Sequence, residues 1–475
     1  MATDVNTGDS PSPASPARGL GLVLAAIVGC EFMLQLDGTI VTVALPDLQN
    51  DLGLSAAGLS WVINAFLLSF GGVLLLGGRL GDLFGHRTLF LSGTALLAAA
   101  SLLAGLAPGP GWLLAGRALQ GAGAALAGPA GLALLSVTYD GERRQRAFGV
   151  YSTVTGLAAA AGMILGGVLT WAADWRWTLL VNVPVGLAVV ALGARTIPAQ
   201  SPVGHAGARP ALDLPGALLS VLGMTAVVHG FVRVAEEGWG DTIAVVSLAG
   251  GAAVLAAFAF LETRVASPIL PPRVFAHRAR AGAFLSLVLL AFVLTGLLFF
   301  LTQFLQRVLG LGPLLTGLAF LPFGLALLLT ARSAPTLIAR AGGPRNLAVA
   351  GLALVVAGSL WLSGVSEDSA YPAAVLGPLV IMGLGAGSAI VPFNVIVLSE
   401  TPPEDAGITS GVLQASLALG GSLGLAVLLT AFAGGGTDVA TGVSRAFTAS
   451  AAIAGLAIVV GLVAWFLPVR AKAAD

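Results

Sequence analysis

The sequence predicts an all-α integral membrane protein with fourteen membrane-spanning helices, on three observations. Hydrophobic residues make up 57% of the 475 residues and charged residues only 9%, whereas soluble globular domains have roughly 25% charged residues. Fourteen apolar stretches are long enough to cross the ~30 Å hydrocarbon core of a bilayer as helices. The basic residues fall mainly in alternate loops between these stretches. Together these observations exclude a soluble protein.

The apolar stretches set the order of the predicted helices. Residues 1–18 before them are rich in Ser, Pro, Asp and Ala, a composition typical of a disordered tail. The first stretch is longer than the core of a signal peptide and lacks a cleavage site of small residues, so we expect it to remain as a helix. The predicted spans are 19–45, 57–77, 88–106, 111–137, 147–172, 177–196, 213–232, 242–262, 281–306, 314–334, 346–364, 371–398, 406–432 and 444–467.

The distribution of basic residues predicts which side of the membrane each loop occupies. An even number of spans places both termini on one side. The loops on that side hold seventeen of the 22 basic residues, the opposite loops hold four, and Arg117 lies within a span. Cytoplasmic loops carry an excess of Lys and Arg, so we expect both termini to be cytoplasmic.

Two loops rich in Pro, Arg and Gly divide the spans into groups of six, two and six, and short segments before the second and tenth spans resemble each other. Two related six-helix halves are typical of secondary transporters, whose substrate site lies between the halves near mid-membrane. The predicted units are a disordered cytoplasmic tail (1–18), an N-terminal six-helix bundle (19–198), a cytoplasmic loop (199–212), an inserted transmembrane hairpin (213–262), a second cytoplasmic loop (263–280), a C-terminal six-helix bundle (281–468) and a cytoplasmic tail (469–475).

The chain lacks the residues that several kinds of chemistry require. The chain has one cysteine, Cys30, and one lysine, Lys472. It can therefore form neither a thiolate metal cluster nor the Gly-Lys-Ser/Thr loop that holds ATP phosphates. Its four histidines show no metal-ligand spacing, and no nucleophilic triad is recognisable. We expect no enzymatic activity, no metal, no cofactor and no nucleic-acid partner.

Three charged residues, Glu31, Asp37 and Arg117, lie deep in predicted spans. A carboxylate at the bilayer centre costs at least ~2.5 kcal/mol and is seldom kept without a partner or a water-filled cavity. Because a carboxylate can bind either a proton or a cation, Asp37 and Glu31 are candidate coupling or cation sites. The alternative for Asp37 is a hydrogen bond that fixes helix packing, and for Glu31 a structural and a functional role are equally open.

The position of these charges adds two expectations. Six residues separate the two carboxylates, which corresponds to a rotation of roughly 120° about the helix axis, so Glu31 and Asp37 need not face one partner. An isolated arginine is costly at this depth. Arg117 should therefore pair with a carboxylate, with backbone carbonyls or with a water chain, and its alternative role is a clamp between helices.

A glycine-rich polar loop follows the second span. Its glycines permit a tight turn, and Asp82 can accept hydrogen bonds from a helix N-terminus or from nearby arginines. We interpret this loop as a cytoplasmic latch between the bundles that breaks and re-forms; the alternative is a simple anchor of topology. The predicted latch consists of Gly78, Asp82, Gly85, Arg87, Arg143, Arg144 and Arg146.

Polar and aromatic side chains within the spans are candidates for a substrate cavity. The alternative for the polar side chains is a hydrogen bond between helices, and for the aromatic ones a place in the core or against lipid. His229, in the inserted hairpin, should lie outside the pathway. The predicted cavity residues are Glu31, Phe32, Trp61, Phe299, Gln303, Asn394 and Gln414.

Four motifs resemble those of one transporter family. Residues 36–46, Leu-Asp-Gly-Thr-Ile-Val-Thr-Val-Ala-Leu-Pro, are similar to its first-helix motif, and residues 78–87 to the loop motif of its whole superfamily. Residues 114–123 resemble the arginine motif of the fourth helix, and residues 175–177 with Asn182 resemble the start of the sixth. From residue 19 on, the chain resembles a fourteen-span drug:proton antiporter of the major facilitator superfamily.

The resemblance implies the major facilitator fold and a mode of action. It implies coupling to the proton gradient instead of a cofactor, with Arg117 in a proton relay. We expect export of amphipathic, often cationic, small molecules such as drugs or antibiotics by alternating access. The expected partners are the substrate, protons and membrane lipid. We expect the protein to function as a monomer in the cytoplasmic membrane of a bacterium. The alternatives are a dedicated exporter of one metabolite or self-made antibiotic and, more remotely, a non-transporting sensor or scaffold.

One position departs from the family pattern. In the fifth span, exporters of the superfamily have Gly-Pro before a pair of glycines, and here Met163 takes the proline position. A proline would bend the helix, so its loss leaves the direction of transport open. Gly162, Gly166 and Gly167 allow close approach of helices, and the first two have the small-xxx-small spacing. We interpret them as packing residues, with a gating role as the second possibility.

Overall fold

The computed structural model describes residues 16–198, 213–265, 268–399, 401 and 406–466, which are helical and contain no strand. The elements are α1 (Pro16–Leu52), α2 (Ala56–Phe84), α3 (His86–Gly105), α4 (Pro110–Thr138), α5 (Gly141–Ala172), α6 (Trp177–Leu180), α7 (Asn182–Thr196), α8 (Leu214–Glu237), α9 (Thr242–Glu262), η1 (Pro272–Phe275), α10 (Arg278–Gln303), η2 (Phe304–Val308), α11 (Pro313–Ala319), α12 (Leu321–Arg340), α13 (Pro344–Leu362), η3 (Pro372–Leu376), α14 (Gly377–Ser399), α15 (Ala406–Ala433) and α16 (Val439–Phe466).

The helices follow the predicted membrane spans closely. Thirteen helical segments within the described ranges are long and apolar enough to cross a bilayer. The remaining predicted span, 147–172, lies on α5, a helix of 32 residues in which the stretch Ala161–Ala172 is apolar. The prediction of an all-α membrane protein is therefore confirmed. The expected count of fourteen spans differs from the observed count only at α5.

Two spans consist of two α-helices each, and a proline follows each break. The span predicted at 177–196 consists of α6 and α7, and the span predicted at 314–334 consists of α11 and α12. Pro184 and Pro322 lack the backbone N–H that would bond to the carbonyl four residues earlier, which weakens the preceding turn. The first break places Asn182 at the start of a helix, from where it reaches the buried network described below.

The helices form two sets with the same pattern of neighbours. In the first set, α1 packs against α5 and α7, while α2 and α3 pack against α4. In the second set, α10 packs against α15 and α16, while α12 and α13 pack against α14. Between the sets, α2 packs against α15 and α5 packs against α11. We call these sets the N-terminal half (α1–α7) and the C-terminal half (α10–α16).

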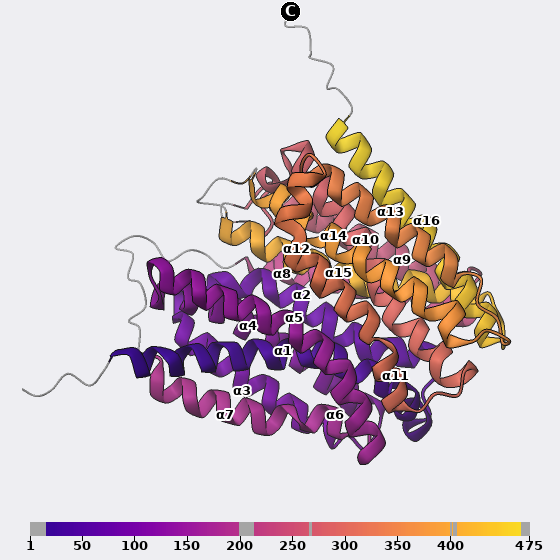
Figure 1. Cartoon of the computed structure of the whole chain (residues 1–475), viewed down its shortest axis with the longest axis horizontal. Coiled ribbons are helices and arrows are strands. Elements are labelled where there is room, and N and C mark those ends of the chain that lie inside the picture. The colour runs from indigo at the N-terminus through magenta and orange to yellow at the C-terminus, as the bar shows by residue number, and fades with distance from the viewer. Residues whose placement is uncertain (1–15, 199–212, 266–267, 400, 402–405, 467–475) are drawn as a thin grey trace, which may run out of the picture.

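The two halves meet at an angle (Figure 1). Successive spans alternate in direction, so α1 begins and α16 ends on one side, which we call the terminal side; the other is the distal side. Figure 1 shows the halves close together around α11 and diverging toward the chain ends. Two hydrogen bonds join the halves at the distal end: Gln306 Nε2 donates to the Val43 carbonyl at 2.7 Å, and Arg307 donates to Gln49 Oε1. The distal side is therefore closed.

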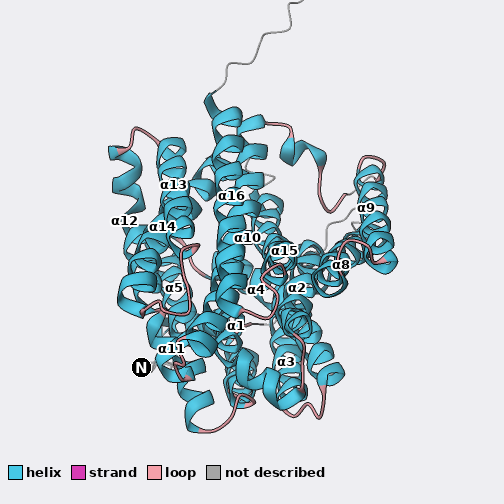
Figure 2. Ribbon diagram, turned by 90° about the vertical axis from the view of Figure 1, so that its right-hand side faces the viewer, coloured by secondary structure: helices cyan, strands magenta, loops and turns pink. Residues whose placement is uncertain are grey.

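The hairpin of α8 and α9 lies at one edge of the molecule (Figure 2). α8 packs against α2 and α15, one helix from each half, and α9 packs against α8. A Cβ at Gly72 of α2 would lie 2.0 Å from Val221 Cγ2 of α8, so this contact needs the glycine. At the distal turn, Asp241 caps the start of α9 and accepts a hydrogen bond from Arg233 Nε at 2.9 Å. The hairpin is a lateral addition along the seam between the halves.

Candidate functional site

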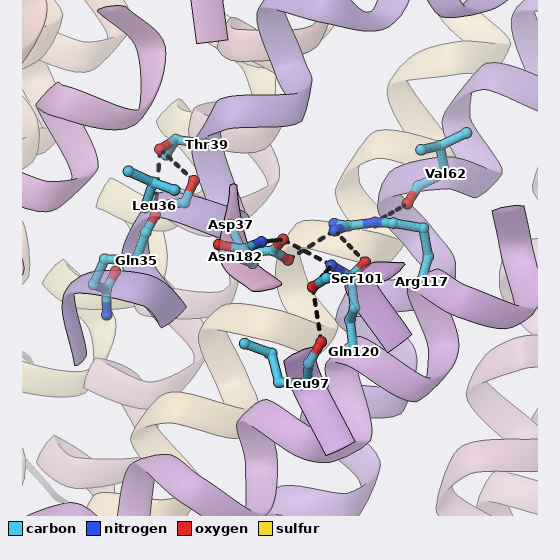
Figure 3. Close-up of polar contacts among 10 residues, drawn as sticks. All are labelled: Gln35, Leu36, Asp37, Thr39, Val62, Leu97, Ser101, Arg117, Gln120 and Asn182. Atoms are coloured by element: carbon cyan, nitrogen blue, oxygen red, sulfur yellow. Dashed lines mark hydrogen bonds and ion pairs between the residues drawn. The ribbon is translucent and has the colours of Figure 1, made fainter. Parts of the chain in front are cut away.

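Asp37 lies at the centre of a buried polar network in the N-terminal half (Figure 3). The residue is completely buried, and its Oδ2 accepts a hydrogen bond from Arg117 Nη1 at 2.7 Å. Its Oδ1 accepts from Gln120 Nε2 at 2.9 Å and from Asn182 Nδ2 at 2.6 Å. Both oxygens therefore have partners on α4 or α7, and the charge is paired as well as hydrogen-bonded, as a buried carboxylate requires.

Arg117 makes further contacts that hold its guanidinium in place. Its Nε donates to the Val62 carbonyl of α2 at 3.1 Å, and its Nη1 also donates to Gln120 Oε1 at 3.0 Å. Its Cζ lies 4.5 Å from the centroid of the Phe66 ring. A desolvated cation over an aromatic face gains about 2 kcal/mol. Arg117 thus pairs with a carboxylate, a backbone carbonyl and an aromatic ring.

Two side chains extend the network to further helices. Gln120 Nε2 also donates to Ser101 Oγ at 2.7 Å, and Ser101 donates to the Leu97 carbonyl of α3 at 2.7 Å. Asn182 reaches Asp37 from the start of α7, and its own Oδ1 is buried without a hydrogen-bond partner in the described part of the chain. The network therefore joins α1, α2, α3, α4 and α7 around one ion pair. Removing one partner of such a pair typically costs ~3–5 kcal/mol.

Glu31 lies on another face of α1 and has different partners. Its Oε1 accepts hydrogen bonds from Gln35 Nε2 at 2.8 Å and from Thr155 Oγ1 at 3.0 Å. Its Oε2 accepts from Tyr151 OH at 2.5 Å. Figure 3 shows Gln35 pointing away from the Asp37 network. All three donors are neutral, so Glu31 is a buried carboxylate whose described partners include no counter-charge.

Two of the predicted cavity residues lie in helix contacts. Trp61 on α2 has its ring centroid 6.3 Å from that of His229 on α8, so it faces the hairpin. Phe299 on α10 is buried, and its ring meets that of Phe300 edge to face at 5.1 Å. Both residues thus take part in helix packing, and their place in a substrate wall stays a prediction.

The other predicted cavity residues occupy more varied surroundings. Phe32 is half-buried, and Gln414 on α15 is exposed. Gln303 on α10 is buried, and its Oε1 has no hydrogen-bond partner within the described ranges. Asn394 on α14 donates to a carbonyl of its own helix. Among the residues that the structure describes, no hydrogen bond joins any two of the predicted cavity residues, Glu31 included, so the prediction of one shared site stays untested.

Arg87, assigned to the predicted latch, binds within the N-terminal half. Its Nε donates to the Ile197 carbonyl and its Nη2 to the Ala194 carbonyl, both at 2.8 Å, at the end of α7. Gly85 links α2 to α3 with a φ of 85°, a conformation that favours glycine. These contacts fix the turn between two helices and do not cross to the C-terminal half.

The remaining latch residues give no described contact between the halves. Arg144 and Arg146 pair with carboxylates four positions earlier, at 3.1 Å and 3.5 Å, around the start of α5, and both pairs are exposed. Arg143 is also exposed. The surroundings of Gly78 and the side chain of Asp82 lie outside the described part of the structure, so the latch stays a prediction.

The three glycines of the fifth span lie where α5 meets two other helices. A Cβ at Gly166 would lie 2.3 Å from the Ile40 carbonyl oxygen of α1, and Gly162 faces the same helix. A Cβ at Gly167 would lie 2.6 Å from the Pro313 carbonyl oxygen of α11 in the other half. Real side chains do not approach backbone this closely, so Gly166 and Gly167 allow contacts that only glycine permits. At Gly162 the added Cβ would meet the Thr39 hydroxyl at 2.0 Å and the Leu36 carbonyl oxygen at 3.1 Å.

Five side chains of these two sites are not singled out by the sequence alone. Tyr151 and Thr155 are four residues apart, which places them on one face of α5, and Gln35 follows one turn after the first acidic residue of α1. Gln120 and Asn182 lie inside the motif segments, where they are polar residues in apolar surroundings. The sequence thus shows that these residues are polar and how they are spaced, but it does not show which helix faces meet.

The fold and the sites define a class of protein. Two sets of membrane-spanning helices with the same internal pattern, and charged groups buried in the membrane interior, are features of secondary transporters. Residues 27–425 match the Major Facilitator Superfamily. The chain therefore belongs to this superfamily.

Two relatives whose names state a role match most of the chain. The chain is 41% identical over 477 residues to the puromycin resistance protein pur8 of Streptomyces alboniger, which covers 97% of this chain and 93% of that protein. It is 40% identical over 420 residues to the cephamycin export protein CmcT of Amycolatopsis lactamdurans, covering 87% and 85%. The crystal structure of the peptide transporter POT in complex with sulfate shares the fold, with a TM-score of 0.68, 15% identity and coverage of 93% of each chain.

Proposed function

We propose that this protein is a proton-coupled exporter of amphipathic small molecules, such as drugs or antibiotics, that works by alternating access. Membership of the Major Facilitator Superfamily supports transport. The similarity along most of the chain to a puromycin resistance protein and a cephamycin export protein supports export and the substrate class. A substrate that is lipophilic and often cationic fits both the apolar helices and the buried carboxylates.

The observation that carries the proton coupling is the pair of buried carboxylates on α1. A coupling group has to exchange a proton inside the membrane, and acidic residues there mark proton relays. Asp37 holds Arg117 through an ion pair at 2.7 Å. Protonation of Asp37 would remove the charge that holds Arg117 and so disturb the contacts of five helices. Glu31 supplies a second exchangeable site on the same helix.

Alternating access needs contacts that break on one side and form on the other. On the distal side and near the middle, Ser422 of α15 donates to Asn64 Oδ1 of α2 at 2.9 Å and Gly167 of α5 meets α11. Further toward the terminal side, Leu74 of α2 and Ala415 of α15 share a small buried apolar cluster. Separation of the distal contacts would open the distal side, and closure of the terminal side would complete the cycle.

The orientation in the membrane follows from the basic residues. The terminal side carries most of the arginines, so we assign it to the cytoplasm. The structure then corresponds to an inward-facing state, in a monomer surrounded by lipid in the cytoplasmic membrane of a bacterium. Protons flowing inward would drive the substrate outward.

A dedicated exporter of one antibiotic is the second candidate. Each of the two relatives above is named for a single antibiotic, and this observation favours the second candidate. Both candidates share the fold and the buried carboxylates. They differ in the number of compounds that the protein accepts, so a panel of unrelated antibiotics and lipophilic cations separates them.

Transport by the purified protein tests the proposal. In proteoliposomes with an imposed pH gradient, we expect accumulation of ethidium or puromycin that stops when a protonophore collapses the gradient. Uptake by empty liposomes is the control. Accumulation that persists without the gradient, or no accumulation of any compound in the panel, would contradict proton-coupled export.

A further inference from the structure

We infer that a crevice between the inserted hairpin and the C-terminal half binds an anionic phospholipid, with an acyl chain in the crevice and the headgroup at the arginine-rich segment before α10. The inference goes beyond the proposed export function and does not depend on it. We call the segment 268–277 the connector and the crevice the hairpin groove. The groove is lined by Met224 of α8, Leu270 and Phe275 of the connector, Val288 of α10, and Leu419 and Leu423 of α15.

The hairpin groove is apolar and opens to the surface of the molecule. Its volume is about 180 Å³, and Ser416 is the one polar side chain among the described residues that line it. Met224, Leu270 and Leu419 are each partly exposed. In Figure 2 the outer helix of the hairpin, α9, lies apart from α10 and α16. The groove therefore opens sideways, toward the lipid that surrounds the protein.

The length of the groove matches one leaflet of a bilayer. The connector joins α9 to α10 on the terminal side, so it closes the groove at that end. Along α15 the lining runs from Val412 to Leu423, which is about 16 Å at 1.5 Å per residue. The hydrocarbon core of a bilayer is ~30 Å thick. The groove thus covers the depth of the acyl chains in the leaflet on the terminal side.

The surroundings of the groove determine what fills it. An empty crevice would forfeit the dispersion contacts of the side chains that line it. Water needs two or more polar partners in a cavity, and the lining offers one hydroxyl. The remaining component at this depth is the hydrocarbon chain of a lipid. An acyl chain is therefore the occupant that the lining and its position favour.

The charge next to the groove selects the headgroup. Residues 263–280 include four arginines and no acidic residue. A cluster of this size beside a membrane span favours anionic lipids. Arg273 is exposed and lies between the lining residues Leu270 and Phe275 in the sequence. Arg264, at the end of α9, is also exposed, with its Cζ 4.9 Å from the centroid of the Phe260 ring.

Hydrogen bonds hold the connector in place over the groove. The Leu270 N–H donates to Glu262 Oε2 at 2.7 Å, which ties the connector to the end of α9. Arg280 Nη2 donates to the Arg273 carbonyl at 2.5 Å, and its Nε donates to the Val274 carbonyl, which ties the connector to α10. A site that is already ordered loses less conformational freedom on binding. The connector therefore presents Arg273 at the mouth of a preformed groove.

Photo-crosslinking in vesicles tests the groove. The full-length protein is reconstituted into dioleoyl phosphatidylcholine with a minor fraction of phosphatidylglycerol that carries a diazirine in one acyl chain. After illumination, peptide mass spectrometry locates the label. We expect enrichment at Val288 and Leu419 over the lipid-facing surface of α9.

A variant that fills the groove shows whether the label depends on it. Met224→Trp should lower the labelling of Val288 and Leu419 at least about tenfold, because the larger side chain removes the room for two or more methylene groups. Leu222→Trp is the matched control, since Leu222 lies on the same helix but is exposed and does not line the groove. Wild-type labelling in Met224→Trp would overturn the groove as the binding site.

A second variant tests the headgroup without changing the groove. The ratio of labelling by the phosphatidylglycerol probe to that by the matching phosphatidylcholine probe should fall about fivefold in Arg273→Gln. This substitution keeps the backbone carbonyl that Arg280 binds. Arg340→Gln, at the exposed end of α12 on the same side, should leave the ratio unchanged. Equal labelling of the wild type by the two probes would contradict recognition of an anionic headgroup.

Competition separates a lipid from a transported compound. We expect ethidium and puromycin to leave the labelling of Val288 and Leu419 unchanged, since the groove holds a lipid. Loss of labelling on addition of either compound would make the groove a substrate site and overturn the proposal. These measurements need no transport, so failure of export leaves the lipid site standing, and an unlabelled groove leaves export standing.

Discussion

At the scale of single residues, Asp37 and Arg117 act as one unit. We expect Asp37→Asn to abolish or strongly reduce proton-coupled export, because an amide keeps the shape of the carboxyl but cannot bind and release a proton. It should also destabilise the protein by ~3–5 kcal/mol, since Arg117 is left buried without a counter-charge. Thermal unfolding in detergent, followed by tryptophan fluorescence, measures the second effect.

A double variant separates the pair from its surroundings. In Asp37→Asn/Arg117→Met no unpaired charge remains, so part of the lost stability should return while transport stays absent. If the two substitutions add without coupling, the ion pair does not have the energetic role assigned to it. Wild-type export in the single variant would remove Asp37 from the coupling mechanism.

The charged members of the site can be predicted from the sequence and their partners cannot. Asp37, Glu31 and Arg117 stand out because charges are rare in apolar spans. Asn182 and Tyr151 do not stand out, because polar uncharged side chains also occur at ordinary helix contacts. Which of them meets a given carboxylate depends on the rotation and tilt of neighbouring helices. The rotation and tilt result from the packing of all helices in the N-terminal half.

At the scale of elements, the contact of α1 with α5 depends on a missing side chain. Gly166→Ala places a Cβ 2.3 Å from the Ile40 carbonyl oxygen, and a backbone oxygen cannot rotate away. We expect a loss of about 1–3 kcal/mol in stability from overpacking, with weaker export because Glu31 and Thr155 face each other across the same contact. Gly149→Ala on α5 is the matched control, since its Cβ would meet nothing within 4 Å. Equal melting temperatures of the two variants would contradict the close contact.

The inserted hairpin should not take part in coupling. His229 is the titratable group in the middle of α8, and its Nδ1 lies 3.1 Å from Ser247 Oγ on α9, within the hairpin. We expect His229→Ala to leave ethidium export and its pH dependence close to wild type in proteoliposomes. Uncoupled transport in this variant would place the hairpin in the proton pathway.

The elements themselves could be predicted well, with instructive exceptions. Hydropathy identifies long apolar spans because a helix has to match the thickness of the bilayer. It does not reveal breaks such as the one before Asn182, because the residues on both sides of the break are apolar and Pro184 can also sit within the first turn of a helix. This break matters for the site, since it determines where Asn182 points.

At the scale of the whole molecule, the seam between α2 and α15 holds a polar contact that should control the state of the transporter. Ser422 donates to Asn64 Oδ1, both residues are completely buried, and Asn64 Nδ2 has no partner within the described ranges. Ser422→Ala leaves the Asn64 carbonyl buried without a donor, at a cost of ~1–3 kcal/mol to the distally closed state. The distally open state should gain population about fivefold or more.

Spin-label distances between the distal ends of the halves measure this shift. Labels at the exposed positions Asn50 on α1 and Leu315 on α11, with Cys30 replaced by Ser, should report a longer distance in Ser422→Ala. Ser450→Ala is the matched control, because Ser450 is also buried but bonds within its own helix. An unchanged distribution in Ser422→Ala would show that the polar contact does not hold the distal side shut.

The sequence predicts a division into two halves, but it does not predict the conformational state of the transporter. The alternation of arginine-rich loops and the weak similarity of residues 54–59 and 314–318 indicate two related units. One sequence supports both the inward-open and the outward-open state, which differ by only a few kcal/mol. The contact of Gln306 with the Val43 carbonyl belongs to one of these states. A sequence pattern that is common to both states cannot predict such a contact.

Proton release on substrate binding measures the coupling most directly. Ethidium is added to the concentrated wild-type protein in weakly buffered detergent, and a pH indicator follows the solution. We expect saturable acidification, because a cation and a proton cannot occupy one buried carboxyl together, and no acidification in a variant carrying both Asp37→Asn and Glu31→Gln. Ethidium binding to the wild type without any proton release would contradict proton-coupled export.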